Sequence, residues 1–235
     1  MTTEAPPARF PWGLTIVCAL AFALLVSLGV WQVQRMRWKE GLIAEAEAAA
    51  THPPVPVMDV YRPRHEFRRV IIDCPGLATA PFVEMKTIED GEVGVRLISA
   101  CALPSKPFVT LVDRGFVSET ISARPPVSSS TAPVRIIGQL RMPPKPSEFA
   151  PPPDGEVFYA RDHLAMGRAL GVREWLAHPM IYATTSSNPD WLALKPSAPP
   201  AAFTNNHLGY ALTWFGLALA LAGFYIALLR RKLTS

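Results

Sequence analysis

The sequence predicts a membrane protein in which two transmembrane helices flank a mainly-β (α+β) extracytoplasmic domain, built on an antiparallel sheet or barrel. Three observations predict this class. Uncharged apolar runs occupy residues 12–31 and 208–229, and short runs of β-branched residues separated by turn signals lie between them. The chain also has 25 prolines in 235 residues, about twice the usual share. Proline favours loops and extended segments over a helical bundle.

Each apolar run reaches about 20 residues, enough to cross the ~30 Å hydrocarbon core of a bilayer. A cleaved signal peptide is the alternative for the first run, but its apolar part is normally about 7–15 residues behind a more basic start than Arg9 alone. We therefore expect a retained anchor. The expected segments are a cytoplasmic N-terminus at 1–11, transmembrane helices at 12–31 and 207–229, a mainly-β domain at 32–206 and a cytoplasmic tail at 230–235.

Basic residues predict the orientation in the membrane, although two clusters compete. The tail carries Arg230, Arg231 and Lys232, which favour a cytoplasmic C-terminus. The first span is followed by three basic residues within 35–39, which by local counting would place that region inside. Long domains translocate largely regardless of charge. We therefore base the orientation on the basic residues of the tail and expect both termini in the cytoplasm.

The middle of the chain reads as a series of strands with few helices. Residues 32–50 are expected to continue the first helix into water until the segment HPPVP (52–56) ends it. One amphipathic helix is expected at 161–170, with Gly171 as its C-cap. Turn signals separate the β-branched runs. The expected strands are 67–74, 82–88, 93–103, 108–117 and 134–140, with two shorter candidates at 157–160 and 180–185.

Several classes of function lack their motifs. The sequence has no GxSxG, HExxH, P-loop or GxGxxG, so we do not expect an enzyme. The net charge of +4 and the absence of a dense Lys/Arg stripe argue against nucleic-acid binding. Asp162 and His163 are expected on a solvated helix face, because adjacent helical residues do not face each other. The remaining loop histidines, His52, His65 and His178, are expected at the surface.

The cysteines leave two alternatives open. Cys18 lies in the first span, whereas Cys74 and Cys101 lie in the middle domain. These two could pair in an oxidising compartment, but we favour two free, buried thiols on strands. No CxxC or CxxCH occurs, which excludes thioredoxin-like redox chemistry and haem attachment through that motif.

The two spans are predicted to pack together through small residues, which let helix backbones approach closely. The small residues with helical spacing are Ala19, Ala23 and Ser27 in the first span and Gly209, Gly216 and Ala220 in the second. In this arrangement the exit of the first span and the start of the second lie at the same membrane surface.

Two helical stripes would converge at that surface. Trp31, Arg35 and Trp38 are spaced i, i+4 and i+7, with Gln32 beside them. The second span begins with a stripe of His207, Tyr210 and Trp214. An interfacial aromatic belt and a snorkelling arginine would explain these residues without a ligand. Alternatively, a neutral imidazole can ligate haem iron, aromatic rings can flank a porphyrin, and arginine can pair with its propionates.

Four segments together resemble the Surfeit locus protein one family: LGVWQVQRMRWKEGLI (28–43), DRGFVS (113–118), GQLR (138–141) and NNHLGYALTWFGLAL (205–219). The resemblance spans nearly the whole chain. The family's central motif usually reads RGWVP after an asparagine, so Asp113, Phe116 and Ser118 depart from it, while Arg114-Gly115 is retained. Gly115 is expected at a tight backbone position.

The resemblance implies an inner-membrane factor of bacterial type, with a periplasmic central domain, that assists cytochrome c oxidase assembly and helps deliver haem a to the catalytic subunit. His207 matches the family histidine implicated in haem handling. We accordingly expect a non-enzymatic haem a chaperone, its partners being the oxidase catalytic subunit, haem a synthase and membrane lipid. The alternative is a scaffold for these proteins that carries no haem. The expected haem site consists of His207 as iron ligand with Tyr210, Trp214, Trp31 and Arg35.

Overall fold

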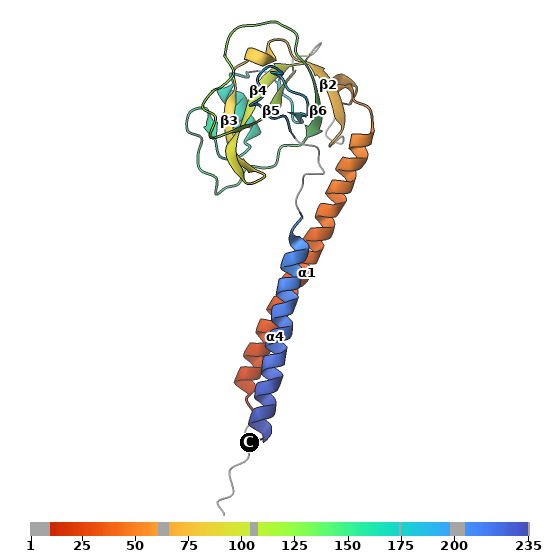
Figure 1. The fold of residues 1–235 in the computed structure, drawn as a ribbon, viewed down its shortest axis with the longest axis vertical. Coiled ribbons are helices and arrows are strands. Elements are labelled where there is room, and N and C mark those ends of the chain that lie inside the picture. The colour runs from red at the N-terminus through yellow and green to blue at the C-terminus, as the bar shows by residue number, and fades with distance from the viewer. Residues whose placement is uncertain (1–9, 61–65, 104–107, 174, 198–204, 235) are drawn as a thin grey trace, which may run out of the picture. The chain divides into compact units, whose positions relative to one another are not determined.

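The computed structural model describes residues 10–60, 66–103, 108–173, 175–197 and 205–234 (Figure 1). Residues 1–9 of the expected cytoplasmic segment, His65 and most of the proline-rich segment 196–202 lie outside the described residues. The chain divides into two compact units, residues 1–44 with 203–235 and residues 45–202. We refer to them as the helical unit and the sheet unit.

The helical unit contains most of α1 (Trp12–Thr51) and all of α4 (His207–Thr234). Both helices are long and apolar enough to cross a membrane. Most of their large apolar side chains are exposed, as expected for surfaces that face lipid. The predicted continuation of the first helix to Ala50 is confirmed, and His52 and Pro53 follow its end. The predicted class, two apolar helices around a mainly-β domain, is likewise confirmed.

α1 and α4 pack antiparallel, because early residues of one helix contact late residues of the other. The Thr15 and Tyr225 hydroxyls are 2.6 Å apart, and the Gln32 side chain meets His207 at 2.7 Å. The predicted packing of the two spans on each other is confirmed. The small residues expected to form the contact are wrong, since Ala23, Ser27, Gly209, Gly216 and Ala220 are exposed, and Ala19, also exposed, only lines a cavity beside α4. The contact uses Gly29 instead, where a Cβ would lie 2.6 Å from the Phe215 ring. Ala211 and Ala218 are the buried small residues of α4.

The sheet unit contains all the expected strands and two short additional ones. Its helical elements are α2 (Val57–Val60), the 3-10 turn η1 (Leu77–Thr79) and α3 (His163–Ala169). The Asp162 side chain caps α3 by accepting a bond from the Ala165 N–H at 2.9 Å, and Gly171 follows its end at φ +72°. The strands are β1 (Val55–Pro56), β2 (Arg69–Asp73), β3 (Val83–Glu89), β4 (Glu92–Ala102), β5 (Phe108–Ser118), β6 (Arg135–Arg141), β7 (Val157–Phe158), β8 (Trp175–Leu176) and β9 (Met180–Ala183).

The strands form one sheet in the order β1-β2-β6-β9-β5-β4-β3-β7, with β8 also paired to β5. The longer ladders β2·β6, β3·β4, β4·β5 and β6·β9 are antiparallel, as expected. The sheet is nevertheless mixed, because β5 pairs in parallel with β9 and β8, and β1·β2 and β3·β7 are also parallel. Apart from β1·β2, these parallel pairings join segments distant in sequence, which local turn signals cannot reveal.

The expectation of two free thiols in the middle domain was wrong, because Cys74 and Cys101 form a disulfide with a Cα–Cα distance of 5.6 Å. Cys74 follows β2 and Cys101 lies on β4, four steps away in the strand order. Across a flat sheet four steps would span about 19 Å. The sheet therefore curls, and both cysteines join one buried cluster with side chains from β2, β5, β6 and β9. The spacing of the cysteines in the sequence does not show that the strands carrying them come together.

Candidate functional site

The polar start of α4 binds directly to α1. The Asn205 side-chain amide donates to the Met36 carbonyl at 3.3 Å, and the His207 Nδ1 lies 2.7 Å from Gln32 Oε1. The backbone carbonyl of Asn206 accepts the first helical bond, from the Tyr210 N–H at 3.4 Å. Asn205 and His207 therefore attach the start of α4 to the side of α1, whereas Asn206 bonds only within its own helix.

The contact with Gln32 defines which nitrogen of His207 carries the proton. A carboxamide oxygen only accepts hydrogen bonds, so Nδ1–H of the ring donates to it. In the neutral ring, Nε2 then holds the free lone pair. Among the described residues, Nε2 has no hydrogen-bond partner. A histidine held in this way through its other nitrogen is the usual arrangement of a metal-ligating histidine.

The aromatic residues of the two stripes lie mostly on the surface of the helical unit. Trp31 is 50% exposed and Tyr210 is 59% exposed, whereas Trp214 is half-buried. The Arg35 guanidinium stacks over the Trp38 ring, 4.3 Å from its centroid. Within the described chain, Arg35 has no ion pair. The structure thus joins His207 to Gln32, the residue after Trp31, whereas Arg35 contacts Trp38 on its own helix.

Two polar residues of this cluster, Gln32 and Asn205, were missed as site residues in the sequence. The Asn205 Oδ1 atom is buried and has no hydrogen-bond donor among the described residues. A buried acceptor without a partner is unusual and marks a place where a donor from a ligand or water fits. Their positions were the available signal, because Gln32 directly follows the first apolar run and Asn205 lies just before the second.

A second cluster, made of buried charges, lies in the sheet unit around Asp113 on β5. The two oxygens of its fully buried carboxylate share the Nε–H of Arg96, at 2.8 and 3.0 Å, and one of them accepts from Arg161 Nη1 at 2.9 Å. Burial alone would raise the pKa of Asp113, but the charges and hydrogen bonds of Arg96 and Arg161 outweigh it and hold this pKa below its usual value. Arg96 also binds Glu89 at 2.5 Å and Ser197.

The next residue, Arg114, is fully buried and sits at a β-bulge. The register of β4 and β5 shifts there, so that Asp113 and Gly115 face consecutive residues of β4 and Arg114 is the extra residue. The Arg114 guanidinium donates to neutral oxygens of four residues, listed here: Ser187, Ser99, Ala78 and Asn188. Burial lowers the pKa of Arg114 to about 10. Since these bonds join β4 and β5 to η1 and to the 187–188 loop, the side chain has a structural role.

Gly115 completes this motif and occupies the tight backbone position expected for it. Its φ is +136°, and a Cβ there would lie 2.2 Å from the Lys195 carbonyl oxygen. The neighbouring Phe116 and Lys195 exchange backbone hydrogen bonds at 2.7 and 2.8 Å. Asp113, Arg114 and Gly115 therefore hold loops onto the sheet, and their polar groups are satisfied within the protein instead of facing a substrate.

The expectation that His163 lies on a solvated helix face was wrong. Its side chain is only 5% exposed, and its ring stacks on His178 with centroids 5.6 Å apart. The Nε2–H donates to the Ala177 carbonyl at 2.9 Å, and burial lowers the pKa of His163. His52 and His178 are exposed, as expected. Within the described ranges, no three His, Cys, Asp or Glu side chains gather as a metal site.

Comparisons with known proteins place these features in one family. The family model described as "SURF1 family" matches residues 19–219. Mouse "Surfeit locus protein 1" is 28% identical over 239 residues, covering 89% of this chain and 72% of the mouse protein. A "SURF1-like protein" of Rickettsia felis is 27% identical and covers 94% of this chain and 98% of its own length. Yeast "Cytochrome oxidase assembly protein SHY1" is 32% identical over 115 residues, 46% of this chain and 30% of the yeast protein.

Proposed function

Because the chain belongs to the SURF1 family, we propose that it is a non-enzymatic assembly factor for a haem-copper terminal oxidase of the cytochrome c oxidase type. The name of the yeast relative supports oxidase assembly. The similarity to a bacterial protein over almost its full length supports a bacterial-type inner membrane. The oxidase catalytic subunit and haem a synthase are the proposed protein partners.

The proposed orientation puts both termini in the cytoplasm and the sheet unit in the periplasm. Arg230, Arg231 and Lys232 at the end of α4 support a cytoplasmic tail. The disulfide between Cys74 and Cys101 supports an oxidising compartment for the sheet unit, because cytosolic thiols are normally kept reduced.

Haem a is the proposed cargo, and the hydrogen bond between His207 and Gln32 carries this proposal. Iron would accept the Nε2 lone pair of a neutral imidazole. The bond from Nδ1–H to Gln32 Oε1 orients the ring and selects the tautomer that leaves Nε2 available. A single histidine ligand also suits a cargo that has to be released.

The neighbouring side chains fit a flat apolar ligand with an anionic edge. Trp31 on α1, next to Gln32, and Tyr210 on α4, three residues after His207, offer exposed aromatic surface. Arg35 is without an ion pair among the described residues and would pair with a propionate. Trp214, seven residues after His207 on the same helical stripe, extends the apolar surface.

A scaffold without haem is the second candidate function, favoured by exposed apolar side chains on the sheet unit. Phe149 is 96% exposed and Leu192 is 87% exposed, and Trp175 is also exposed. Large apolar side chains exposed to water can contact a partner protein. In this alternative the sheet unit would hold the oxidase subunit or haem a synthase, and His207 would only connect the helices.

The visible spectrum of the purified full chain, co-expressed with haem a synthesis, tests the proposal. We expect a haem a band in the wild-type protein, loss of that band in His207→Ala, and a 10- to 100-fold weaker affinity in Gln32→Met, because a lost partner of a ligating histidine has roughly this effect. His178→Ala is the matched control, an exposed histidine of the sheet unit. Folded protein without pigment would favour the scaffold, and equal pigment in His207→Ala would show that His207 is not the ligand.

A further inference from the structure

α1 and α4 approach each other closely where Gly29 faces the ring of Phe215. Gly29 is buried, and a Cβ there would lie 2.6, 2.7 and 2.9 Å from three ring carbons of Phe215. Carbon atoms in contact are normally about 3.5–4.0 Å apart, so any side chain at this position would push against the ring. The other glycines of these two helices have open space at the same point: Gly13, Gly41, Gly209, Gly216 and Gly223. The contact thus requires a glycine at position 29.

Gly29 shares one face of α1 with the two residues that bind the start of α4. Gln32 and Met36 are three and seven residues after it, which is the spacing of one helix face. Gln32 Oε1 lies 2.7 Å from His207 Nδ1. The Met36 carbonyl accepts from the Asn205 side chain at 3.3 Å. Because Gln32 is only about 4.5 Å along α1 from Gly29, the separation of the helices at Gly29 determines their separation at Gln32.

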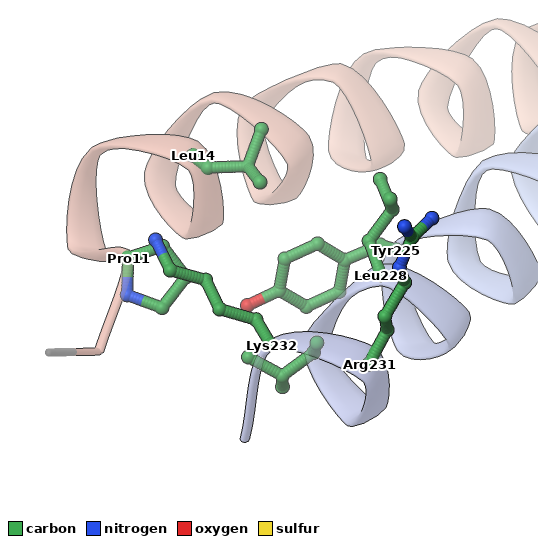
Figure 2. A pocket seen from close by; sticks show the side chains of 7 residues that line it. Pro11, Leu14, Tyr225, Leu228, Arg231 and Lys232 are labelled. Carbon is green, nitrogen blue, oxygen red and sulfur yellow. The ribbon is translucent and has the colours of Figure 1, made fainter. Parts of the chain in front are cut away.

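The far end of the helix pair is held by another contact. The Tyr225 ring lies between the two helices near the start of α1 (Figure 2), and its hydroxyl is 2.6 Å from Thr15 Oγ1. Along α1, Gly29 is about 21 Å from Thr15 and Gln32 is about 26 Å from it. With that end held, a side chain inserted at Gly29 would swing α4 outward, and the displacement would be larger at Gln32. A contact of 3.6 Å is no longer a hydrogen bond, so an outward movement of about 1 Å would break the contact of 2.7 Å at Gln32.

We propose that Gly29 is a positioning residue for His207. By admitting the Phe215 ring, it sets the distance between α1 and α4 at which the Nδ1–H of His207 reaches Gln32. This bond selects the tautomer in which Nε2 carries the lone pair. The consequence for haem a rests on the proposed function, whereas the tautomer is a property of the chain without any cargo.

Nitrogen NMR of the full chain in detergent, labelled at histidine and free of haem, reads the tautomer directly. The His207 signal is assigned from its loss in His207→Ala, and we expect the proton on Nδ1 in the wild type. In Gly29→Leu the bond to Gln32 should be lost, so the proton should no longer be confined to Nδ1. The double variant Gly29→Leu/Phe215→Ala removes the ring that the leucine meets and should restore the wild-type signal. Gly41→Leu is the matched control, because a Cβ there meets nothing within 4 Å.

The visible spectrum gives a second readout. Gly29→Leu should weaken the affinity for haem a about 10- to 100-fold, as Gln32→Met does, because both remove the partner of a ligating histidine. The double variant should recover the wild-type affinity, and Gly41→Leu should retain it. If the NMR signals change as expected while the wild-type protein takes up no haem a, the proposed function fails and the positioning role of Gly29 stands.

Three outcomes would overturn the proposal. An unchanged His207 signal in Gly29→Leu would show that the Phe215 ring turns aside without moving α4. An equal change in Gly41→Leu would show that any larger side chain in α1 disturbs His207. A double variant that behaves like Gly29→Leu would show that the leucine acts through something other than the Phe215 ring.

Discussion

Reduction of the disulfide between Cys74 and Cys101 should lower the free energy of unfolding of the sheet unit by about 3.6 kcal/mol at 25 °C. The two cysteines are 27 residues apart in the sequence. A cross-link that closes a loop of this length removes about 12 cal/mol/K of chain entropy from the unfolded state. The corresponding free energy of about 3.6 kcal/mol is a large part of the 5–15 kcal/mol by which a typical domain is stable.

The comparison of the oxidised and the reduced protein isolates this contribution, because both sulfur atoms remain in the buried cluster. Urea unfolding of the full chain in one detergent, followed by far-ultraviolet circular dichroism, gives the two free energies. Cys18→Ala in both samples removes the remaining thiol, which is unpaired. The double variant Cys74→Ala/Cys101→Ala should be at least as unstable as the reduced protein, since it also loses the packing of both sulfur atoms.

A difference below about 1 kcal/mol would refute the reasoning, since loop closure would then contribute far less than the chain-entropy relation requires. The same conclusion would follow if the double alanine variant unfolded at the urea concentration of the oxidised protein. In that case residues 75–100 would already be restricted in the unfolded chain, and the disulfide would not stabilise the fold.

Two further predictions concern the buried motif on β5. Asp113→Asn should cost about 3–5 kcal/mol of stability, because it leaves Arg96 and Arg161 buried without their carboxylate. Since Arg96 and Arg161 hold the pKa of Asp113 in the folded protein below its usual value, its stabilising effect is complete above the unfolded pKa of about 3.9 and is lost as the pH falls through the folded pKa. Gly115→Ala should cost more than about 2 kcal/mol, because φ is +136° and a Cβ would meet a backbone oxygen at 2.2 Å.

Urea or thermal unfolding of each variant measures these effects, and the chain offers matched controls. Asp73→Asn removes a carboxylate that pairs with Arg135 at the exposed surface, so little change is expected. A similar loss of stability in Asp113→Asn and Asp73→Asn would mean that burial of the carboxylate does not determine the size of the loss. Gly155→Ala tests a positive φ of +57° with open space around it. A Gly115→Ala cost equal to that of Gly155→Ala would mean that the contact with Lys195 is unimportant.

Much of the fold could be predicted because the signals are local. Residues 12–31 and 208–229 are apolar and uncharged, and a run of about 20 such residues predicts a span from its own composition. The β4 and β5 strands were predicted within a few residues, because β-branched residues and flanking turn signals lie in the same segment. The order of the strands and the parallel pairing of β5 with β9 depend on contacts between distant segments.

The candidate site was also predicted only where its signal is local. His207 was selected from the sequence, because a histidine at the start of an apolar helix is unusual and the family motif contains it. Its partner Gln32 is 175 positions away, and only packing of α1 on α4 shows that they meet. The helix faces were assigned wrongly from spaced small residues, because three-residue and four-residue spacing occurs on several faces of an apolar helix. Gly29 identifies the contact only once Phe215 is seen against it.

The sequence by itself determined the two apolar helices, the strands between them and the family, because composition and short motifs are properties of contiguous residues. Tertiary structure alone decided which groups meet. It paired Cys74 with Cys101 by curling the sheet, placed Arg114 at a bulge among neutral oxygens, and gave His207 an acceptor on α1. The physical reason is that a disulfide or hydrogen bond requires two groups within a few ångströms, and that proximity arises from the folding of segments far apart in the chain.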